Sequence, residues 1–230
     1  AQPLPDGPWV MTPSLSYPGP RPFTREETDI FFGREEHTDE LLEILGRSHF
    51  LAVLGPSGCG KSSLVRAGML SALETGFISS AGARWRVADM RPGDRPLTRL
   101  AAALMGETAL EHERHNESDA LEFLSATLRR GPLGLIEVLR ETPLPPHTNL
   151  LVFVDQFEEI FRFRDKGTSH RDESDAFVTM LLDTAAQREM PVYVAITMRS
   201  DYLGHCAVFA GLPEAMNHSQ YLTPRLTREQ

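Results

Sequence analysis

The chain has 230 residues, a length typical of one large domain or one domain with short appendages, which excludes a long array of repeats. Hydrophobic residues make up 41% of the sequence, and with the 17 glycines this composition excludes a disordered or fibrous chain as the main state. The formal net charge is −9, so the chain as a whole lacks the positive field with which proteins bind nucleic acids or anionic membranes.

The cysteines and the apolar runs bear on the compartment in which the protein works. Cys59 and Cys206 are the only cysteines, and a chain of this length needs no cross-links, so we expect free thiols in the cytoplasm. The longest apolar runs, such as Leu51–Leu54 and Leu150–Val154, are far too short to span a membrane. No signal segment follows Ala1, and we expect this chain to be a piece of a longer protein.

The N-terminal segment, residues 1–22, is predicted to be an extended tether. Prolines recur in it at positions 3, 5, 8, 13, 18, 20 and 22. Because each proline removes a backbone donor and fixes φ, neither a helix nor a central strand can run through the segment. From Thr24, which can form a capping box with Glu27, the pattern becomes helical, and residues 23–230 are assigned to one folded core.

Short apolar runs alternate with helical stretches along this core. The runs that indicate strands are Phe50–Leu54, Trp85–Ala88, Leu150–Val154, Val192–Thr197 and, more weakly, Tyr221-Leu222. Helical spacing covers Lys61–Leu73, Leu97–Met105, Asp119–Arg130, Leu133–Arg140, Phe157–Phe163, Asp175–Arg188 and Asp201–Phe209. The alternation predicts an α/β fold, a three-layer sandwich around a mainly parallel five-stranded sheet. Residues 97–147 are predicted to contain a helical insertion, and Arg162–Asp175 a solvated loop.

A phosphate-binding motif follows the first predicted strand. Gly55–Ser62 reads GPSGCGKS and matches G-x-x-x-x-G-K-[ST] in full, between a strand and a helix as the mechanism requires. The glycines let backbone N–H groups point at phosphate oxygens, and the start of the helix adds its positive end. We expect Lys61 to reach the β- and γ-phosphates of ATP and Ser62 to bind Mg²⁺. The predicted nucleotide-binding residues of this loop are Pro56, Ser57, Gly58, Cys59, Gly60, Lys61, Ser62 and Ser63.

A second motif ends the strand Leu150–Val154. Asp155 follows it at the sheet edge where open α/β folds bind ligands, and an aspartate there can hold Mg²⁺, usually through water. Hydrolysis also needs a carboxylate that orients water toward the γ-phosphate. Because Gln156 occupies the next position, the candidates are Glu158 and Glu159. We favour Glu158, which returns to the side of Asp155 if Gln156 opens a helix.

Arg199 follows the fourth predicted strand. An arginine at the mouth of a central strand can contact the γ-phosphate with a geometry that lysine would not reproduce. The alternative is a surface arginine paired with Asp201. For the base, guanine-specific enzymes would show N-K-x-D, and residues 116–119 read N-E-S-D, so adenine is favoured.

Several motifs together resemble the novel STAND NTPase domain, a class of signal-transduction ATPases with numerous domains, over about residues 17–225. They are Tyr17–Phe23, Phe31–Glu35, the phosphate loop continuing to Gly68, Met90–Gly93, Val154–Phe161 and Thr197–Asp201. The resemblance implies a switch in which ADP holds a closed form, ATP opens it, and oligomerisation activates an attached effector in signalling or bacterial defence. It also implies that Phe32, Gly33 and Arg34 lie against adenine and that Arg199 senses the γ-phosphate.

The sequence leaves two functional classes open. The first is a slow, Mg²⁺-dependent ATPase switch whose partners are ATP, further copies of the NTPase domain, and attached effector and sensor domains, with lid and winged-helix domains following this chain. The second is a nucleotide-binding scaffold with negligible hydrolysis, which Gln156 motivates because an acidic residue often stands at that position in P-loop ATPases. Neither membrane nor nucleic-acid binding is indicated.

Overall fold

A five-stranded parallel sheet forms the centre of the computed structural model, which describes residues 21, 23, 33–74, 84–106, 109–110 and 117–224. The strands are β1 (Phe50–Gly55), β2 (Arg84–Met90), β3 (Thr148–Val154), β4 (Val192–Arg199) and β5 (Gln220–Leu222). They lie in the order β2-β3-β4-β1-β5, and every pairing is parallel. The predicted α/β class and all five predicted strands are confirmed.

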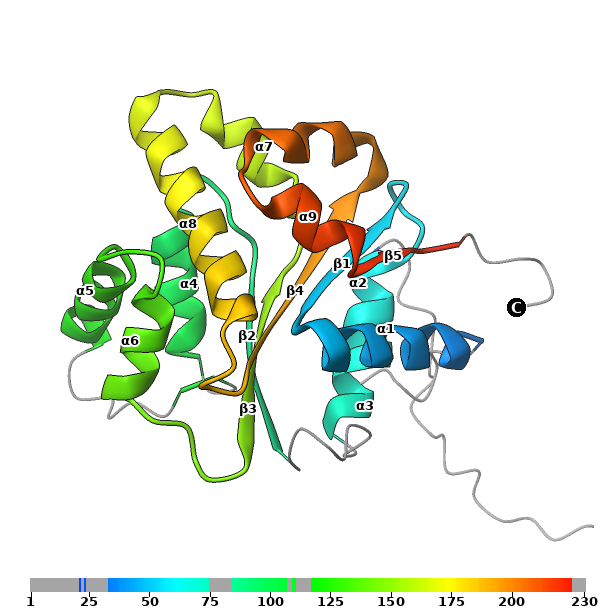
Figure 1. The fold of residues 1–230 in the computed structure, drawn as a ribbon, viewed down its shortest axis with the longest axis horizontal. Helices are drawn as coiled ribbons and strands as arrows, with labels where there is room; N and C mark the ends of the chain where they lie inside the picture. The colour runs from blue at the N-terminus through cyan, green and yellow to red at the C-terminus, as the bar shows by residue number, and fades with distance from the viewer. Residues whose placement is uncertain are drawn as a thin grey trace, which may run out of the picture.

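Helices cover both faces of this sheet, which gives the three predicted layers (Figure 1). On one face lie α1 (Glu35–Ser48) and the continuous helix made of α2 (Lys61–Ser63), a π-helical part (Leu64–Leu70) and α3 (Ser71–Glu74). The other face carries α4 (Pro96–Leu104), α5 (Glu117–Leu128), α6 (Gly134–Glu141), α8 (Thr168–Ala186) and α9 (Leu212–Asn217). Since α4, α5 and α6 all lie between β2 and β3, the predicted helical insertion is present in this crossover.

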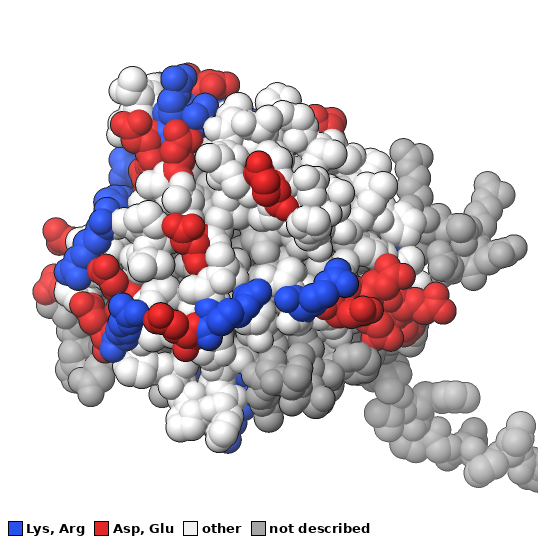
Figure 2. Space-filling model, in the orientation of Figure 1, with Lys and Arg blue, Asp and Glu red and all other residues white. Residues whose placement is uncertain are grey.

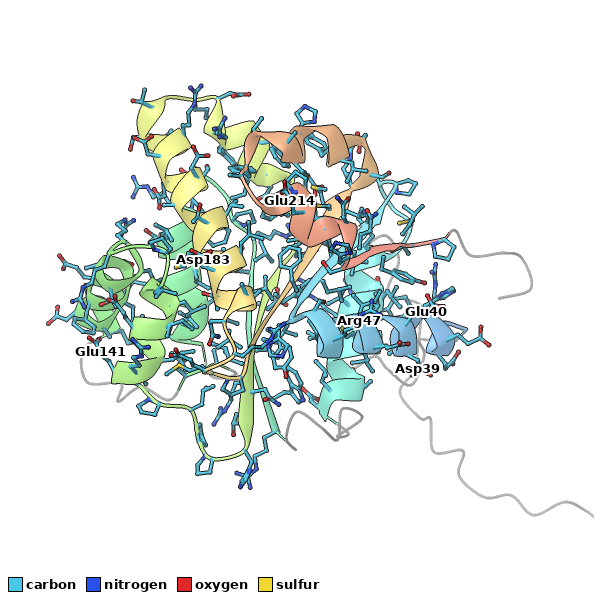
Figure 3. The ribbon with its side chains drawn as sticks, viewed as in Figure 1. Asp39, Glu40, Arg47, Glu141, Asp183 and Glu214 are labelled. Carbon is cyan, nitrogen blue, oxygen red and sulfur yellow. The ribbon has the colours of Figure 1, made fainter. Side chains whose placement is uncertain are left out.

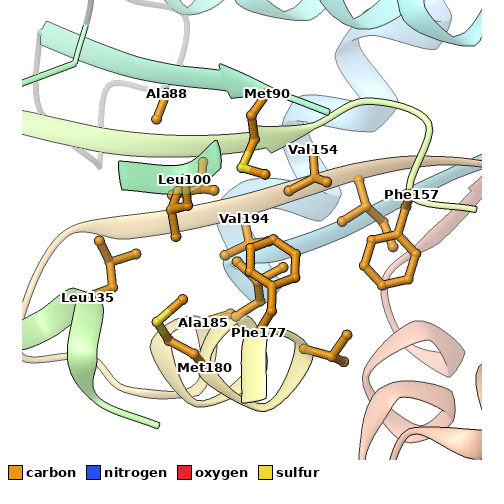
Figure 4. Packing of buried hydrophobic residues seen from close by; sticks show 14 of the residues in the cluster. Ala88, Met90, Leu100, Leu135, Val154, Phe157, Phe177, Met180, Ala185 and Val194 are labelled. Atoms are coloured by element: carbon orange, nitrogen blue, oxygen red, sulfur yellow. The ribbon is translucent and has the colours of Figure 1, made fainter. Parts of the chain in front are cut away.

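The two cores follow from the alternation of side chains along the strands. In β3, Leu150, Val152 and Val154 enter the core beneath α4, α6 and α8, whereas Leu151 and Phe153 enter the core beneath α1. Figure 4 shows the first of these cores, where side chains of α4, α6 and α8 meet those of the sheet. A strand that is covered on both faces accounts for the uninterrupted apolar run in the sequence.

The segment Arg162–Asp175 differs from its prediction as a solvated loop. Helix α7 (Glu159–Arg164) continues into it, and α8 begins at Thr168. The charged side chains that suggested a loop lie instead on partly exposed helical surfaces, where Arg164 pairs with Asp175 through two hydrogen bonds of 3.0 and 3.2 Å. The last predicted helix, Asp201–Phe209, also differs in type, because Ser200–Val208 forms a 3₁₀ helix and not an α-helix.

The negative charge is unevenly distributed over the surface. Figure 2 shows acidic side chains gathered over α1, where Figure 3 labels Asp39 and Glu40. Helix α1 buries Leu41 and Leu45 on its other side, so it has one acidic face and one apolar face. Among the described residues, no helix is both long enough and apolar enough to cross a membrane. The predicted N-terminal tether, apart from residue 21, and the capping box at Thr24 lie outside the described residues.

Candidate nucleotide-binding site

The phosphate loop joins β1 to α2 and turns through two glycines with left-handed backbone. Gly58 has φ of +73° and Gly60 has φ of +90°, conformations that residues with a side chain rarely adopt. Gly60 is also the residue before the helix, so the loop delivers the backbone N–H groups of the first helical turn to the carboxyl edge of the sheet.

Lys61 lies folded over this loop. Its Nζ donates to the carbonyl oxygens of Gly55 and Pro56, at 2.9 and 2.8 Å, and lies 4.0 Å from Cys59 Sγ. These contacts hold the ammonium group beside the backbone that forms the loop. Phosphate oxygens entering the loop would therefore meet a positive charge that is already in place.

Asp155 connects the phosphate loop to β4. Its carboxylate is fully buried, and Oδ1 accepts hydrogen bonds of 2.6 Å from both Ser62 Oγ and Thr197 Oγ1. Thr197 Oγ1 in turn accepts a bond of 3.0 Å from the backbone N–H of Gln156. Burial alone would raise the pKa of Asp155, but the donors Ser62 and Thr197 and the Arg66 guanidinium outweigh it and hold the pKa below its usual value. Asp155 is therefore ionised at neutral pH.

The pair Ser62 and Asp155 has the chemistry of a magnesium site. Hydroxyl and carboxylate oxygens are hard ligands, and Mg²⁺ is usually held by one or two such side chains together with substrate phosphates and water. Within the described parts of the chain, no group of three or more His, Cys, Asp or Glu side chains could hold a metal alone. The donors present thus fit a Mg²⁺ ion that arrives with a nucleotide.

Glu158 lies on the wall of the same pocket. The pocket measures about 540 Å³ and is lined, among others, by Lys61, Ser62, Glu158 and Arg199. Glu158 Oε2 accepts a bond of 3.3 Å from the backbone N–H of Arg199, the last residue of β4. Glu159 points elsewhere, since its Oε2 accepts a bond of 3.1 Å from the N–H of Gly93.

The route of the chain to Glu158 differs from the expected one. Gln156 has φ of +56° and does not open a helix, because residues 155–158 form a turn and α7 begins only at Glu159. The turn is fixed by the bond from Gln156 N–H to Thr197 and by a bond of 2.8 Å from Phe157 N–H to the Thr197 carbonyl. It brings Glu158 back to the pocket, the placement favoured from the sequence, by a different backbone path.

Arg199 lies at the pocket, and its guanidinium is paired with Asp201. Nε and Nη2 donate to the two carboxylate oxygens at 3.0 and 2.6 Å, and the guanidinium lies 5.7 Å from the centre of the Tyr202 ring. The hydrogen bonds between these two groups raise the pKa of Arg199 and lower that of Asp201. The structure thus shows the pairing with Asp201, and contact of Arg199 with the γ-phosphate stays a prediction.

Arg34 joins the start of α1 to the phosphate loop. It is 4% exposed, and its Nη2 donates to the carbonyl oxygens of Cys59 and Pro224 at 3.4 and 3.1 Å. Burial lowers the pKa of this guanidinium. Gly33 precedes it with φ of +77°, and Phe32 lies outside the described residues. Arg34 thus helps to position the phosphate loop through its bond to the Cys59 carbonyl. Contact of residues 32–34 with adenine stays a prediction.

Comparison with known proteins identifies the family of this chain. The sequence profile described as Novel STAND NTPase 1 matches residues 16–230. The chain belongs to this family. No curated protein matches the chain.

Solved structures share the fold of this STAND NTPase domain. The Aeropyrum pernix ORC2 protein, in ADPNP–ADP complexes, aligns with a TM-score of 0.53 at 14% identity, over 84% of this chain and 48% of that one. A Walker-type ATPase of Pyrococcus abyssi aligns with a TM-score of 0.52 at 16% identity, over 91% of this chain and 57% of that one. The STAND chain spans about half the length of these two proteins.

Sequence reasoning missed two residues of the STAND site. Thr197 was placed at the end of a strand and in a motif of the family but was given no role in the site, yet it bonds to the Asp155 carboxylate. Arg66, which bonds to the same carboxylate at 3.0 Å, had one available signal: it follows Ser62 by four residues on a predicted helix and so lies on the same helical face.

Cys59 provides a test of the loop that does not depend on turnover. Its thiol is partly exposed near Lys61 and a helix N-terminus, whereas Cys206 is 2% exposed and burial raises the pKa of Cys206 to about 11. We expect alkylation of Cys59 to outpace that of Cys206, to slow when Mg-ATP is bound, and to abolish nucleotide binding once complete. Mass spectrometry resolves the two rates, and a Cys59 rate that is slow or indifferent to nucleotide would contradict this expectation.

Proposed function

We propose that this STAND NTPase domain binds ATP with Mg²⁺ and hydrolyses it slowly as a molecular switch. The observation that carries the proposal is the bond of 2.6 Å between Ser62 of the phosphate loop and the buried Asp155, in a pocket that Lys61 and Glu158 also line. A P-loop hydroxyl and a strand-end carboxylate in contact form the pair that holds Mg²⁺ in P-loop NTPases. The family and the fold support nucleotide binding.

Each polar group of the pocket has a role in this proposal. Lys61 would exchange its bonds to Gly55 and Pro56 for bonds to the β- and γ-phosphates, while the loop N–H groups hold the remaining oxygens. When bound, Mg²⁺ supplies neutralisation of the phosphate charge. Glu158, held by the N–H of Arg199, would accept a proton from the attacking water.

The switching part of the proposal depends on a group that distinguishes ATP from ADP. Arg199 is the candidate, because it lies on the pocket wall and would have to share its guanidinium between Asp201 and the γ-phosphate. Such differential binding is what allows a nucleotide to shift a conformational equilibrium. In this scheme ATP favours an oligomer of the NTPase domain, and the oligomer activates attached effector and sensor domains. The process would serve cytoplasmic signalling or defence. Residues 1–22 would be a tether that precedes the core.

Arg199→Ala is expected to weaken ATP binding about tenfold, the scale of one lost bond to a charged group, and to change ADP binding by less than about threefold. Equilibrium titrations with both nucleotides measure the ratio. Arg140→Ala is the matched control, since Arg140 also pairs with an exposed carboxylate, Glu189, at 3.1 Å on a different surface. Equal losses for ATP and ADP would assign Arg199 to its pairing with Asp201 alone.

The proposed nucleotide is tested by titrating the chain with ATP and GTP, each in Mg²⁺ and in EDTA. The proposal expects ATP to bind more tightly than GTP and Mg²⁺ to strengthen ATP binding. If the chain bound neither ATP nor GTP, the proposed function would be wrong.

A scaffold that binds ATP with negligible hydrolysis is the second candidate. The observation that favours it is Gln156, a neutral residue where many P-loop ATPases have an acid, which follows Asp155 and lines the pocket. This candidate shares the expected binding and differs only in turnover.

A further inference from the structure

Thr197 of β4 is tied to the turn that follows β3. Regular pairing between the two strands ends where Val154 lies opposite Ile196, and the chain then turns. Beyond that point the Thr197 hydroxyl accepts a bond of 3.0 Å from Gln156 N–H, and the Thr197 carbonyl accepts one of 2.8 Å from Phe157 N–H. One residue of β4 therefore holds the backbone of the turn at two successive positions.

The Thr197 hydroxyl has to be a donor and an acceptor at once. It donates to Asp155 Oδ1 at 2.6 Å, and this ionised carboxylate can only accept, whereas the Gln156 N–H can only donate. Thr197 is 1% exposed, so solvent does not compete for these bonds. Valine has nearly the same shape as threonine but can make neither bond, and it would leave both partners unsatisfied.

The turn has a backbone conformation that needs such support. Gln156 has φ of +56°, in the left-handed region that residues with a side chain seldom occupy. Conformations of this kind persist where surrounding contacts hold them, and they are common at functional sites. The residue that this turn presents to the pocket is Glu158, whose Oε2 accepts a bond of 3.3 Å from Arg199 N–H. The backbone of the turn and the carboxylate it carries are thus both held by the last three residues of β4.

We propose that Thr197 is a positioning residue for ATP hydrolysis, whose hydroxyl holds the left-handed turn that presents Glu158 to the attacking water. This inference rests on the proposed function, because it concerns the base of that reaction. In this scheme the Thr197 hydroxyl acts only through the turn. Nucleotide binding does not depend on it, since Asp155 keeps its bonds to Ser62 and Arg66.

The test is a double-mutant cycle on the single-turnover rate with Mg-ATP. In Thr197→Val we expect hydrolysis to slow about tenfold or more, because a displaced general base loses rate steeply, and ATP affinity to change by less than about threefold. In Glu158→Gln the base is already lost, so adding Thr197→Val should slow hydrolysis by less than about twofold. A residue with a merely structural role would lower the rate by the same factor in both backgrounds.

Two further variants serve as rescue and control. Thr197→Ser keeps the hydroxyl and should retain a rate within about threefold of that of the unaltered chain. Thr148→Val is the matched control, since Thr148 begins β3 at the end of the strand away from the pocket, is 4% exposed, and donates a bond of 3.4 Å to the Pro146 carbonyl. It should leave the rate unchanged.

Should Thr197→Val fail to fold by circular dichroism, the half-buried Gln156 provides the test. Gln156→Gly and Gln156→Val both remove the amide side chain, but glycine adopts left-handed backbone readily, whereas a β-branched residue resists it. We expect hydrolysis to be about tenfold slower in Gln156→Val than in Gln156→Gly, at similar ATP affinity.

The outcomes separate this inference from the proposed function. The role of Thr197 would be overturned, with the ATPase intact, by an unchanged rate in folded Thr197→Val, by an equal slowing in the Glu158→Gln background, by a loss confined to ATP affinity, or by a Thr197→Ser rate as low as that of Thr197→Val. Where Thr197→Val does not fold, equal rates in the two Gln156 variants would overturn it. If the unaltered chain binds ATP but does not hydrolyse it, the proposed hydrolysis itself fails, and the positioning role fails with it.

Discussion

Replacing Lys61 by alanine is expected to remove most of the nucleotide affinity of this domain. The phosphates would lose their principal cation while the backbone of the loop remains, and truncating one member of a buried charged pair costs about 2–5 kcal/mol, or roughly 30-fold or more in affinity. The change also frees the Gly55 and Pro56 carbonyls, whose bonds to Nζ are local and partly exposed, so we expect the fold to persist. Titration with ATP measures the loss.

The chain supplies its own control for this change. Lys166 is the other lysine in the sequence, and its ammonium lies 4.3 Å from the centre of the Phe163 ring, outside the phosphate loop. Lys166→Ala should bind ATP like the unaltered chain. Unchanged ATP binding in Lys61→Ala would contradict the assignment of the phosphate loop.

Glu158→Gln is expected to preserve ATP binding and to slow hydrolysis about 10²-fold or more, the usual scale for a positioned general base. Glutamine keeps the size of the side chain and can still accept the bond from Arg199 N–H, so shape and contacts are conserved while the base is lost. Single-turnover rates with Mg-ATP measure the effect.

Glu159→Gln is the matched comparison, because the neighbouring carboxylate bonds to Gly93 and faces away from the phosphate loop. We expect it to slow hydrolysis far less. If Glu159→Gln were the more damaging change, the identity of the base would be wrong even though the site is correct.

The parts of the site that could be predicted from the sequence are those marked by a short, continuous sequence motif. The phosphate loop is continuous in sequence, and Asp155 follows an apolar run that only a strand covered on both faces explains. Because all parallel strands end at one edge, these two signals also placed Lys61, Ser62 and Asp155 together.

The parts that could not be predicted depend on tertiary contacts. Asp89 is the second-to-last residue of the edge strand β2, and only the fold shows that Arg66 bridges it to Asp155. The left-handed turn at Gln156 is fixed by Thr197 of another strand, so Glu158 reaches the pocket by a backbone path that the expected helix does not describe. The start of α8 was hidden because its first turns are rich in charge and its buried apolar residues come later, beginning with Phe177 and Val178.

A single-turnover experiment with the chain in excess over Mg-ATP shows directly whether this domain hydrolyses ATP. We expect bound ATP to be converted to ADP in a slow single-exponential phase, which disappears when EDTA replaces Mg²⁺ and slows about 10²-fold in Glu158→Gln. Separation of the nucleotides at successive times gives the rate. ATP that binds but stays intact in Mg²⁺, at the same level in the unaltered chain and in Glu158→Gln, would contradict the proposed ATPase activity and leave a nucleotide-binding scaffold.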